Sequence, residues 1–117
     1  MAKQIATGGA HHISLTVTDM GRSRDFYTTL LSFKPVMDLP GGGVLLNNGQ
    51  LTLALHTAPD PGQAPPADRF NENRVGLDHL SFSVSSRAEM EEAARMFDEC
   101  AVSHGEIDAM TWDGGRG

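Results

Sequence analysis

A chain of 117 residues is long enough to bury one hydrophobic core and too short to bury two independent ones. Its formal net charge of −6, without a basic stripe that could neutralise phosphates, predicts that nucleic acid is not a partner. No apolar run approaches the roughly 20 residues that span a bilayer, so we expect neither a signal peptide nor a membrane anchor. The single cysteine, Cys100, cannot form an internal disulfide, which favours a reducing, cytoplasmic location.

The first strand-like segment is HISLTV at residues 12–17, where polar and apolar side chains alternate. Successive residues of a strand point to opposite faces, so His12, Ser14 and Thr16 are expected on one face and the aliphatic residues on the other. A helical pattern follows in MGRSRDFYTTLL, residues 20–31, with Asp19 as its expected N-cap. These signals predict a strand followed by a helix.

Three further strand-like segments come after the helix: FKPVMDL at 33–39, the end of GGGVLL at 41–46, and LTLALHT at 51–57. Asn48 and Gly49 separate the last two, and Asn-Gly between apolar runs predicts a hairpin with a type I′ turn. The glycines at 41–43 are followed by neither Lys-Ser nor Lys-Thr, so they predict a plain turn and not a phosphate loop. Residues from about 10 to 57 thus form one βαβββ module.

The segment from about 58 to 74 contains four prolines and predicts a linker, which serves either as a lid or as a plain connector. After it, DHLSFSV at 78–84 repeats the pattern of HHISLTV at 11–17. Ser86 and Glu89 then form an S-x-x-E capping box for a second helix. Its buried stripe should consist of Met90, Ala93, Ala94, Phe97 and Cys100. The likeness of the two segments predicts a duplicated unit, with a partial second module from about 75 to 117.

Three histidines are expected on the small or polar faces of three strands: His12, His56 and His79. Such a face is typical of a hollow that holds a ligand. A lone histidine on a strand is more often structural, but His12 and His79 hold equivalent places in a repeat, which favours a shared ion. Neutral imidazole is a good ligand for Zn, Fe, Ni or Mn, so we predict a divalent metal ion bound by these two residues. His11 should point to the opposite face from His12, and His104 should be a cation favoured by the dipole of the second helix.

The paired modules contain LTVTDMGRSRDFYTTLLSFKPV in the first copy and GLDHLSFSVSSRAEMEEA in the second. They resemble the vicinal oxygen chelate superfamily of glyoxalases, bleomycin-resistance proteins and extradiol dioxygenases. The resemblance runs from about Ala10 onward. It implies an α+β fold in which paired βαβββ modules form a cupped mixed sheet with helices on its outer face. In that superfamily the first strand of each module supplies a metal ligand, which matches His12 and His79.

The sequence departs from this superfamily in two places. The fourth strand of a module usually supplies a carboxylate ligand, and here Ala54 or His56 stands in its place. The closing stretch MTWDGGRG, residues 110–117, is similar to the part that leads into the last two strands of the second module. The resemblance therefore implies a second module without its last two strands and without the carboxylate that they would carry.

The resemblance implies a metal-dependent enzyme, either a lyase, an isomerase or a dioxygenase, with a small oxygenated molecule as its substrate. His56 would then complete the ligand shell of the metal or move a proton as a catalytic residue. The alternative is a metal-free protein that binds a small molecule or an antibiotic, as bleomycin-resistance proteins do, and a third reading is a short chain without activity. The resemblance also implies a homodimer, because modules of that superfamily often pair across subunits. In addition, an unpaired sheet edge is a template for another strand.

Overall fold

A computed structural model describes residues 3–107, and the chain divides into two compact units. Unit 1 (Met1–Asp68) contains a sheet with one helix, and unit 2 (Arg69–Gly117) contains a second helix. Within residues 3–107, no helix is long and apolar enough to cross a membrane. The stretch MTWDGGRG, on which the prediction about the last two strands depends, lies outside the described residues.

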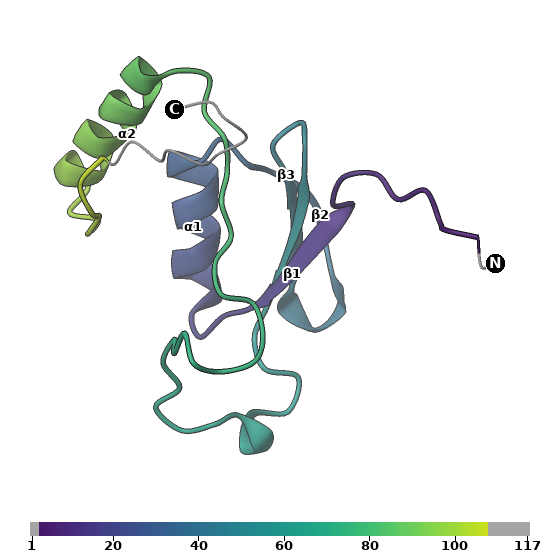
Figure 1. The fold of residues 1–117 in the computed structure, drawn as a ribbon. Coiled ribbons are helices and arrows are strands. Elements are labelled where there is room, and N and C mark those ends of the chain that lie inside the picture. Colours follow the sequence, from purple (N-terminus) through teal and green to yellow (C-terminus); the bar gives the residue numbers. More distant parts are fainter. Residues whose placement is uncertain (1–2, 108–117) are drawn as a thin grey trace. The chain divides into compact units, whose positions relative to one another are not determined.

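Unit 1 folds as a four-stranded mixed sheet (Figure 1). Its main elements in chain order are β1 (His12–Thr16), α1 (Met20–Leu30), β2 (Lys34–Asp38), β3 (Val44–Asn47) and β4 (Thr52–His56). The strand order across the sheet is β1-β4-β3-β2, with β1 parallel to β4 and the other neighbours antiparallel. The βαβββ order predicted for module one and the α+β class are thereby confirmed.

Helix α1 begins and ends where local hydrogen bonds replace the missing helical ones. The side chain of its N-cap, Asp19, accepts a hydrogen bond from the backbone N–H of Arg22 at 3.0 Å, as the sequence predicts. At the other end Ser32 adopts a left-handed conformation with φ of 61°, and the N–H of Phe33 then donates to the carbonyl of Tyr27 at 3.1 Å. The rings of Tyr27 and Phe33 pack edge to face, which holds the end of the helix against the sheet.

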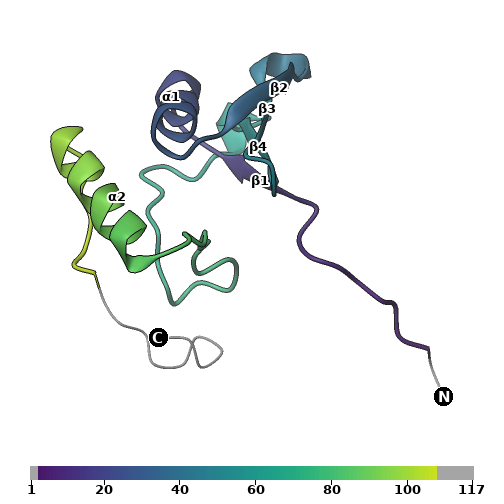
Figure 2. The same cartoon turned by 90° about the horizontal axis from the view of Figure 1, so that it is seen from above.

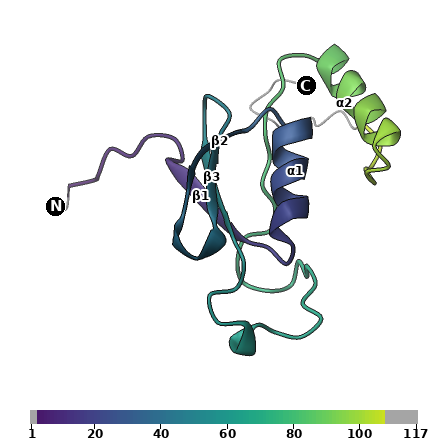
Figure 3. The same cartoon turned by 180° about the vertical axis from the view of Figure 1, so that it is seen from behind.

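The core of unit 1 lies between α1 and one face of the sheet. Figure 2 and Figure 3 show the helix over that face from two further directions. The face is built from alternate residues of β3 and β4, so its side chains pair across the strands: Val44 with Leu55 and Leu46 with Leu53. These four and Phe33 are the largest fully buried side chains among the described residues. The opposite face is left for smaller and more polar groups.

Two turns connect β2, β3 and β4 of unit 1. The glycines at 41–43 form a plain turn, as predicted, with φ of 82° at Gly41 and 93° at Gly42. Gly43 is buried, and a Cβ there would lie 2.9 Å from the carbonyl oxygen of Leu55, so this position has no room for a side chain.

The hairpin between β3 and β4 differs in detail from the predicted type I′ turn. The N–H of Asn48 donates to the carbonyl of Leu51, so the turn is centred on Gly49 and Gln50, one residue later than expected. Within it only Gly49 has a positive φ, 95°, whereas type I′ requires two such residues. The reason is the Asn48 side chain, whose oxygen accepts from the N–H groups of Gln50 and Leu51 at 2.9 Å and stabilises a different turn.

In unit 2 the predicted helix is present as α2 (Arg87–Glu99). Its N-cap Ser86 accepts from the N–H of Glu89 at 3.2 Å, and the Glu89 carboxylate accepts from the N–H of Ser85 at 3.3 Å. The capping box is thus confirmed, with its return bond shifted by one residue. The predicted buried stripe is only half-buried at Ala93, Ala94 and Phe97, while Met90 and Cys100 are exposed.

The strand predicted at 78–84 is not formed in unit 2. This segment has no strand hydrogen bonds and is mostly exposed, although its sequence alternates like β1. A single strand is stable only when it pairs with others, and none of residues 69–107 offers it a partner strand. Helix α2 likewise has no fully buried residue.

Candidate functional site

The face of the unit 1 sheet opposite α1 is the candidate site, and we call it the polar face. In-register pairing of β1 with β4 places His12 beside Thr52, Ser14 beside Ala54, and Thr16 beside His56. Paired residues of neighbouring strands point to the same side, so these six side chains share one face. All six are small or polar, and two of them are imidazoles. The prediction that His12, Ser14 and Thr16 share a face is therefore consistent with the observed register.

His56 is half-buried at the end of β4, and its ring is oriented by the backbone. Nδ1 lies 3.0 Å from the carbonyl oxygen of Thr57, which can only accept, so Nδ1 carries the proton in the neutral ring. Nε2 then has a lone pair, and the hydroxyl of Thr16 lies 3.4 Å from it. A histidine held in this way can accept a proton or coordinate a metal through Nε2.

His12 lies at the start of β1 and is exposed. Its Nδ1 is 2.9 Å from Nδ1 of His11, and the two rings meet edge to face with centroids 5.1 Å apart. The prediction that His11 points away from His12 is wrong, because His11 precedes the strand and the alternation of a strand does not apply to it. Nε2 of His12 is not engaged by His11 and can serve as a ligand atom.

The register separates His12 from His56. Their positions are four residues apart along the paired strands, a distance of about 13 Å at ~3.3 Å per residue. A zinc ion bonds to imidazole nitrogens at ~2.0–2.1 Å, so the two rings could share one ion only if both side chains extended toward each other along the sheet. Ala54 lies two residues closer to His12 than His56 does, and it offers only a methyl group.

His79 belongs to unit 2 and is exposed there. Its Nδ1 lies 2.7 Å from a carboxylate oxygen of Asp78, which fixes the proton on Nδ1 and leaves the Nε2 lone pair available. A carboxylate bonded to one imidazole nitrogen commonly orients a metal-ligating histidine through the other. Over the described range 3–107, no group of three or more His, Cys, Asp or Glu side chains is arranged to hold a metal ion.

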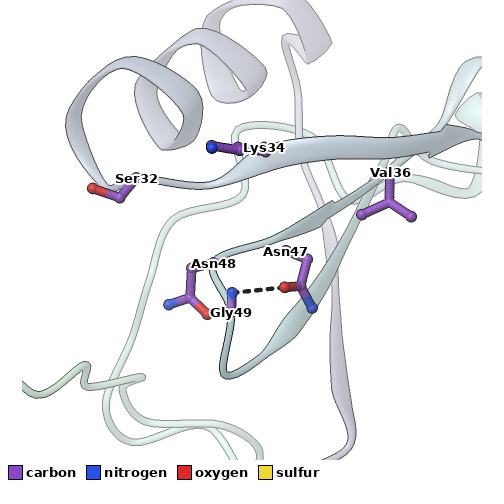
Figure 4. A pocket seen from close by; sticks show the side chains of 6 residues that line it. All are labelled: Ser32, Lys34, Val36, Asn47, Asn48 and Gly49. Atoms are coloured by element: carbon purple, nitrogen blue, oxygen red, sulfur yellow. Dashed lines mark hydrogen bonds between the residues drawn. The ribbon is translucent and has the colours of Figure 1, made fainter.

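A hollow at one corner of the polar face was not anticipated from the sequence. Figure 4 shows it between the start of β2 and the β3–β4 hairpin. Its volume is about 360 Å³, and it is lined by Ser32, Lys34, Val36, Asn47, Asn48 and Gly49. The Asn-Gly hairpin was a partial signal for it, because a hairpin fixes which residues of β3 lie beside those of β4, although not the pairing of β3 with β2.

His104 lies beyond the C-terminus of α2 rather than within it. Nδ1 lies 2.7 Å from the carbonyl oxygen of Gly105 and Nε2 lies 2.7 Å from the carboxylate of Asp98. Both nitrogens can donate only in the imidazolium form, so these bonds raise the pKa of His104 above its ordinary 6.5. The predicted cation is therefore favoured, by direct hydrogen bonds in addition to any effect of the helix dipole.

We expect the stabilisation from His104 to depend on pH. A raised folded-state pKa means that it is fully present below pH 6.5 and is lost as the pH rises through the folded pKa. A proton NMR titration of the His104 ring should give a pKa above 6.5, and Asp98→Asn should lower it while the Gly105 bond remains. A ring that titrates at or below 6.5 would contradict this assignment.

Comparison with known proteins gives a consistent picture. A family model described as Glyoxalase/Bleomycin resistance protein/Dioxygenase superfamily matches residues 9–117. A glyoxylase/bleomycin resistance protein/dioxygenase domain from Frankia sp. EAN1pec is 30% identical, with a TM-score of 0.66, covering 84% of this chain and 73% of that chain. A lactoylglutathione lyase from Agrobacterium tumefaciens is 21% identical, with a TM-score of 0.67, covering 94% and 81%, and is similar in fold alone. No curated protein matches.

Proposed function

We propose that this chain, which belongs to the glyoxalase/bleomycin resistance protein/dioxygenase superfamily, is a metal-dependent enzyme acting on a small oxygenated molecule. The reaction class would be that of a lyase, an isomerase or a dioxygenase. The observation that supports this best is the polar face, where a sheet covered on its other side by α1 carries hydroxyls and two imidazoles. Such a surface suits an oxygen-rich ligand better than it suits a packed core.

We infer that His12 and His79 are the metal ligands. Both imidazoles have Nε2 available, and neutral imidazole suits Zn, Fe, Ni or Mn. The donor type fits a divalent ion, although residues 3–107 contain no group of three or more His, Cys, Asp or Glu side chains arranged to hold one. A bound divalent ion would act as a Lewis acid toward a substrate oxygen.

His56 is proposed as a proton acceptor for the substrate and not as a metal ligand. Thr57 holds its Nδ1–H, which leaves Nε2 to accept a proton at the far end of the polar face. The separation of about 13 Å along the strands supports placing it outside the coordination sphere of His12.

For His56→Gln we therefore expect metal affinity within about twofold of the parent and a clear loss of substrate turnover, in line with the 10²–10⁴-fold contribution of general acid–base groups. Calorimetric metal titration tests the first half without any knowledge of the substrate. A tenfold or greater loss of metal affinity would instead make His56 a ligand.

The direct test of the proposed function is metal analysis of protein purified without an affinity tag, followed by calorimetric titration of the metal-stripped chain with Zn²⁺, Ni²⁺ and Mn²⁺. Saturable binding of one ion per site supports the proposal. Failure of all three ions to bind would favour the second candidate, a metal-free protein that binds a small molecule or an antibiotic. That candidate draws support from the lining of the polar face, where Ser14, Thr16, Asn47, Thr52 and Ala54 bring no carboxylate.

We also propose a homodimer. In the sheet order β1-β4-β3-β2, the outer edge of β1 is open among the described residues. Open edges are templates for a second strand, and this one carries His12 at its start. Light scattering at high micromolar concentration should give twice the mass of the chain, and a monomer there would contradict the proposal.

A further inference from the structure

The hollow beside Lys34 is part of the polar face, and one row of paired residues connects it to His12. The register pairs His12 with Thr52, Thr52 with Asn47, and Asn47 with Lys34, so these four residues form one row across all four strands. The amide of Asn47 donates to the hydroxyl of Thr52 at 3.1 Å, which ties the middle of the row together. Strands lie ~4.8 Å apart, so Lys34 is about 14 Å from His12 along this row.

Lys34 brings a positive charge to the hollow, and no carboxylate among the described residues pairs with it. Across residues 3–107, the side chain of Lys34 takes part in no ion pair or hydrogen bond, although the chain as a whole has a net charge of −6. Its ammonium group has three donors and no acceptor. A ligand that reaches this corner with an anionic oxygen would satisfy it.

Asn48 supplies a second donor in a fixed orientation. Its side-chain oxygen accepts from the N–H groups of Gln50 and Leu51, both at 2.9 Å, so the amide cannot rotate freely. The Nδ2 group is left as a donor on the lining of the hollow, and the hydroxyl of Ser32 is a third polar group there. Asn47 contributes less, because its oxygen accepts from the N–H of Gly49 at 2.6 Å (Figure 4) and its nitrogen donates to the hydroxyl of Thr52.

We propose that this hollow binds a carboxylate group of the ligand, which makes the substrate an organic acid. One ammonium charge with neutral amide and hydroxyl donors matches a monoanion, whereas a phosphate dianion would meet only one positive charge on an acidic chain. A volume of about 360 Å³ suits the end of a small molecule. The inference rests on the proposed function for the role of the rest of the polar face, but binding of the carboxylate needs no metal.

The experiment is an NMR titration of the metal-stripped chain, with propionate, its uncharged analogue propionamide, and inorganic phosphate as probes. We expect saturable shifts of the Gly49 N–H and the Asn48 side-chain amide with propionate, and much weaker shifts with propionamide. Lys34→Gln should weaken propionate binding at least about tenfold, since a hydrogen bond to a charged group is lost. Lys34→Arg should retain it, and Lys3→Gln, a distant exposed lysine, should leave it unchanged.

Two results would overturn the proposal. Propionate shifts that are absent, or that Lys34→Gln leaves unaltered, would show that the hollow does not hold a carboxylate. Phosphate that binds as tightly as propionate would show that the site does not select the monoanion. Because no metal is present, these outcomes are independent of the titrations that test metal binding, and either proposal can fail while the other stands.

Discussion

Replacing either His12 or His79 by Ala is expected to weaken binding of a divalent ion at least about 100-fold. Even the loss of an outer partner that orients a metal ligand typically costs 10–100-fold, so loss of the ligand itself should cost more. Each ring offers Nε2 as the ligand atom, with Nδ1 directed to His11 in one case and to Asp78 in the other. Calorimetric titration of the metal-stripped chain measures both losses.

The double variant tests whether the two histidines hold the same ion. If they do, a single replacement already destroys the site, so the double variant should bind no more weakly than the worse single variant. Independent sites would instead give losses that add in free energy. His104→Ala is the matched control, because its ring is committed to Asp98 and Gly105 at the end of α2 and its loss should leave metal affinity unchanged.

A further variant distinguishes the proposed metal ligand, His79, from the carboxylate of Asp78 that orients its ring. Asp78→Asn keeps the size of the side chain that bonds to Nδ1 of His79 but removes its charge. We expect a smaller loss of affinity than for His79→Ala, because the carboxylate orients the ring and raises its basicity without touching the metal. A loss as large as that of His79→Ala would indicate that Asp78 is itself a ligand.

The sequence was sufficient for module one because its signals are local. Alternation in residues 12–17, the Asp19 cap and the hairpin at Asn48-Gly49 each act within a few residues, and together they define β1, α1, β3 and β4. Residues 78–84 show the same alternation, but they do not form the predicted strand. Whether an alternating segment becomes a strand depends on a partner, and sequence periodicity says nothing about which partners are present.

The candidate site could be predicted only in part for a related reason. The faces of His12 and His56 follow from the period of a strand, but the distance between them depends on how β1 and β4 are aligned. In the same way, Lys34 and Asn48 are not close in the sequence, and they meet only because β2 pairs with β3. The alignment of the strands therefore favours the proposal that His56 carries a proton over the alternative that it is a ligand, and it revealed the hollow.

The two faces of the sheet should also differ in what their side chains contribute to stability. Leu53→Ala, on the face covered by α1, is expected to lower the free energy of unfolding by about 2–5 kcal/mol, because Leu53 is fully buried and its loss leaves a cavity. Leu45→Ala is the matched control. Leu45 pairs with Ala54 on the polar face and is only half-buried, so the same deletion there should cost about 1 kcal/mol.

Urea unfolding with linear extrapolation measures both changes, and Leu53→Val keeps the comparison measurable if the alanine variant is too unstable to purify. The difference in stability between the two variants matters for function. A ligand site needs a face whose side chains are not packed into the hydrophobic core. Leu45→Ala should therefore change the shape of the polar face while the chain stays folded. Equal losses for Leu45→Ala and Leu53→Ala would mean that both faces are packed, and the polar face would then have no room for a ligand.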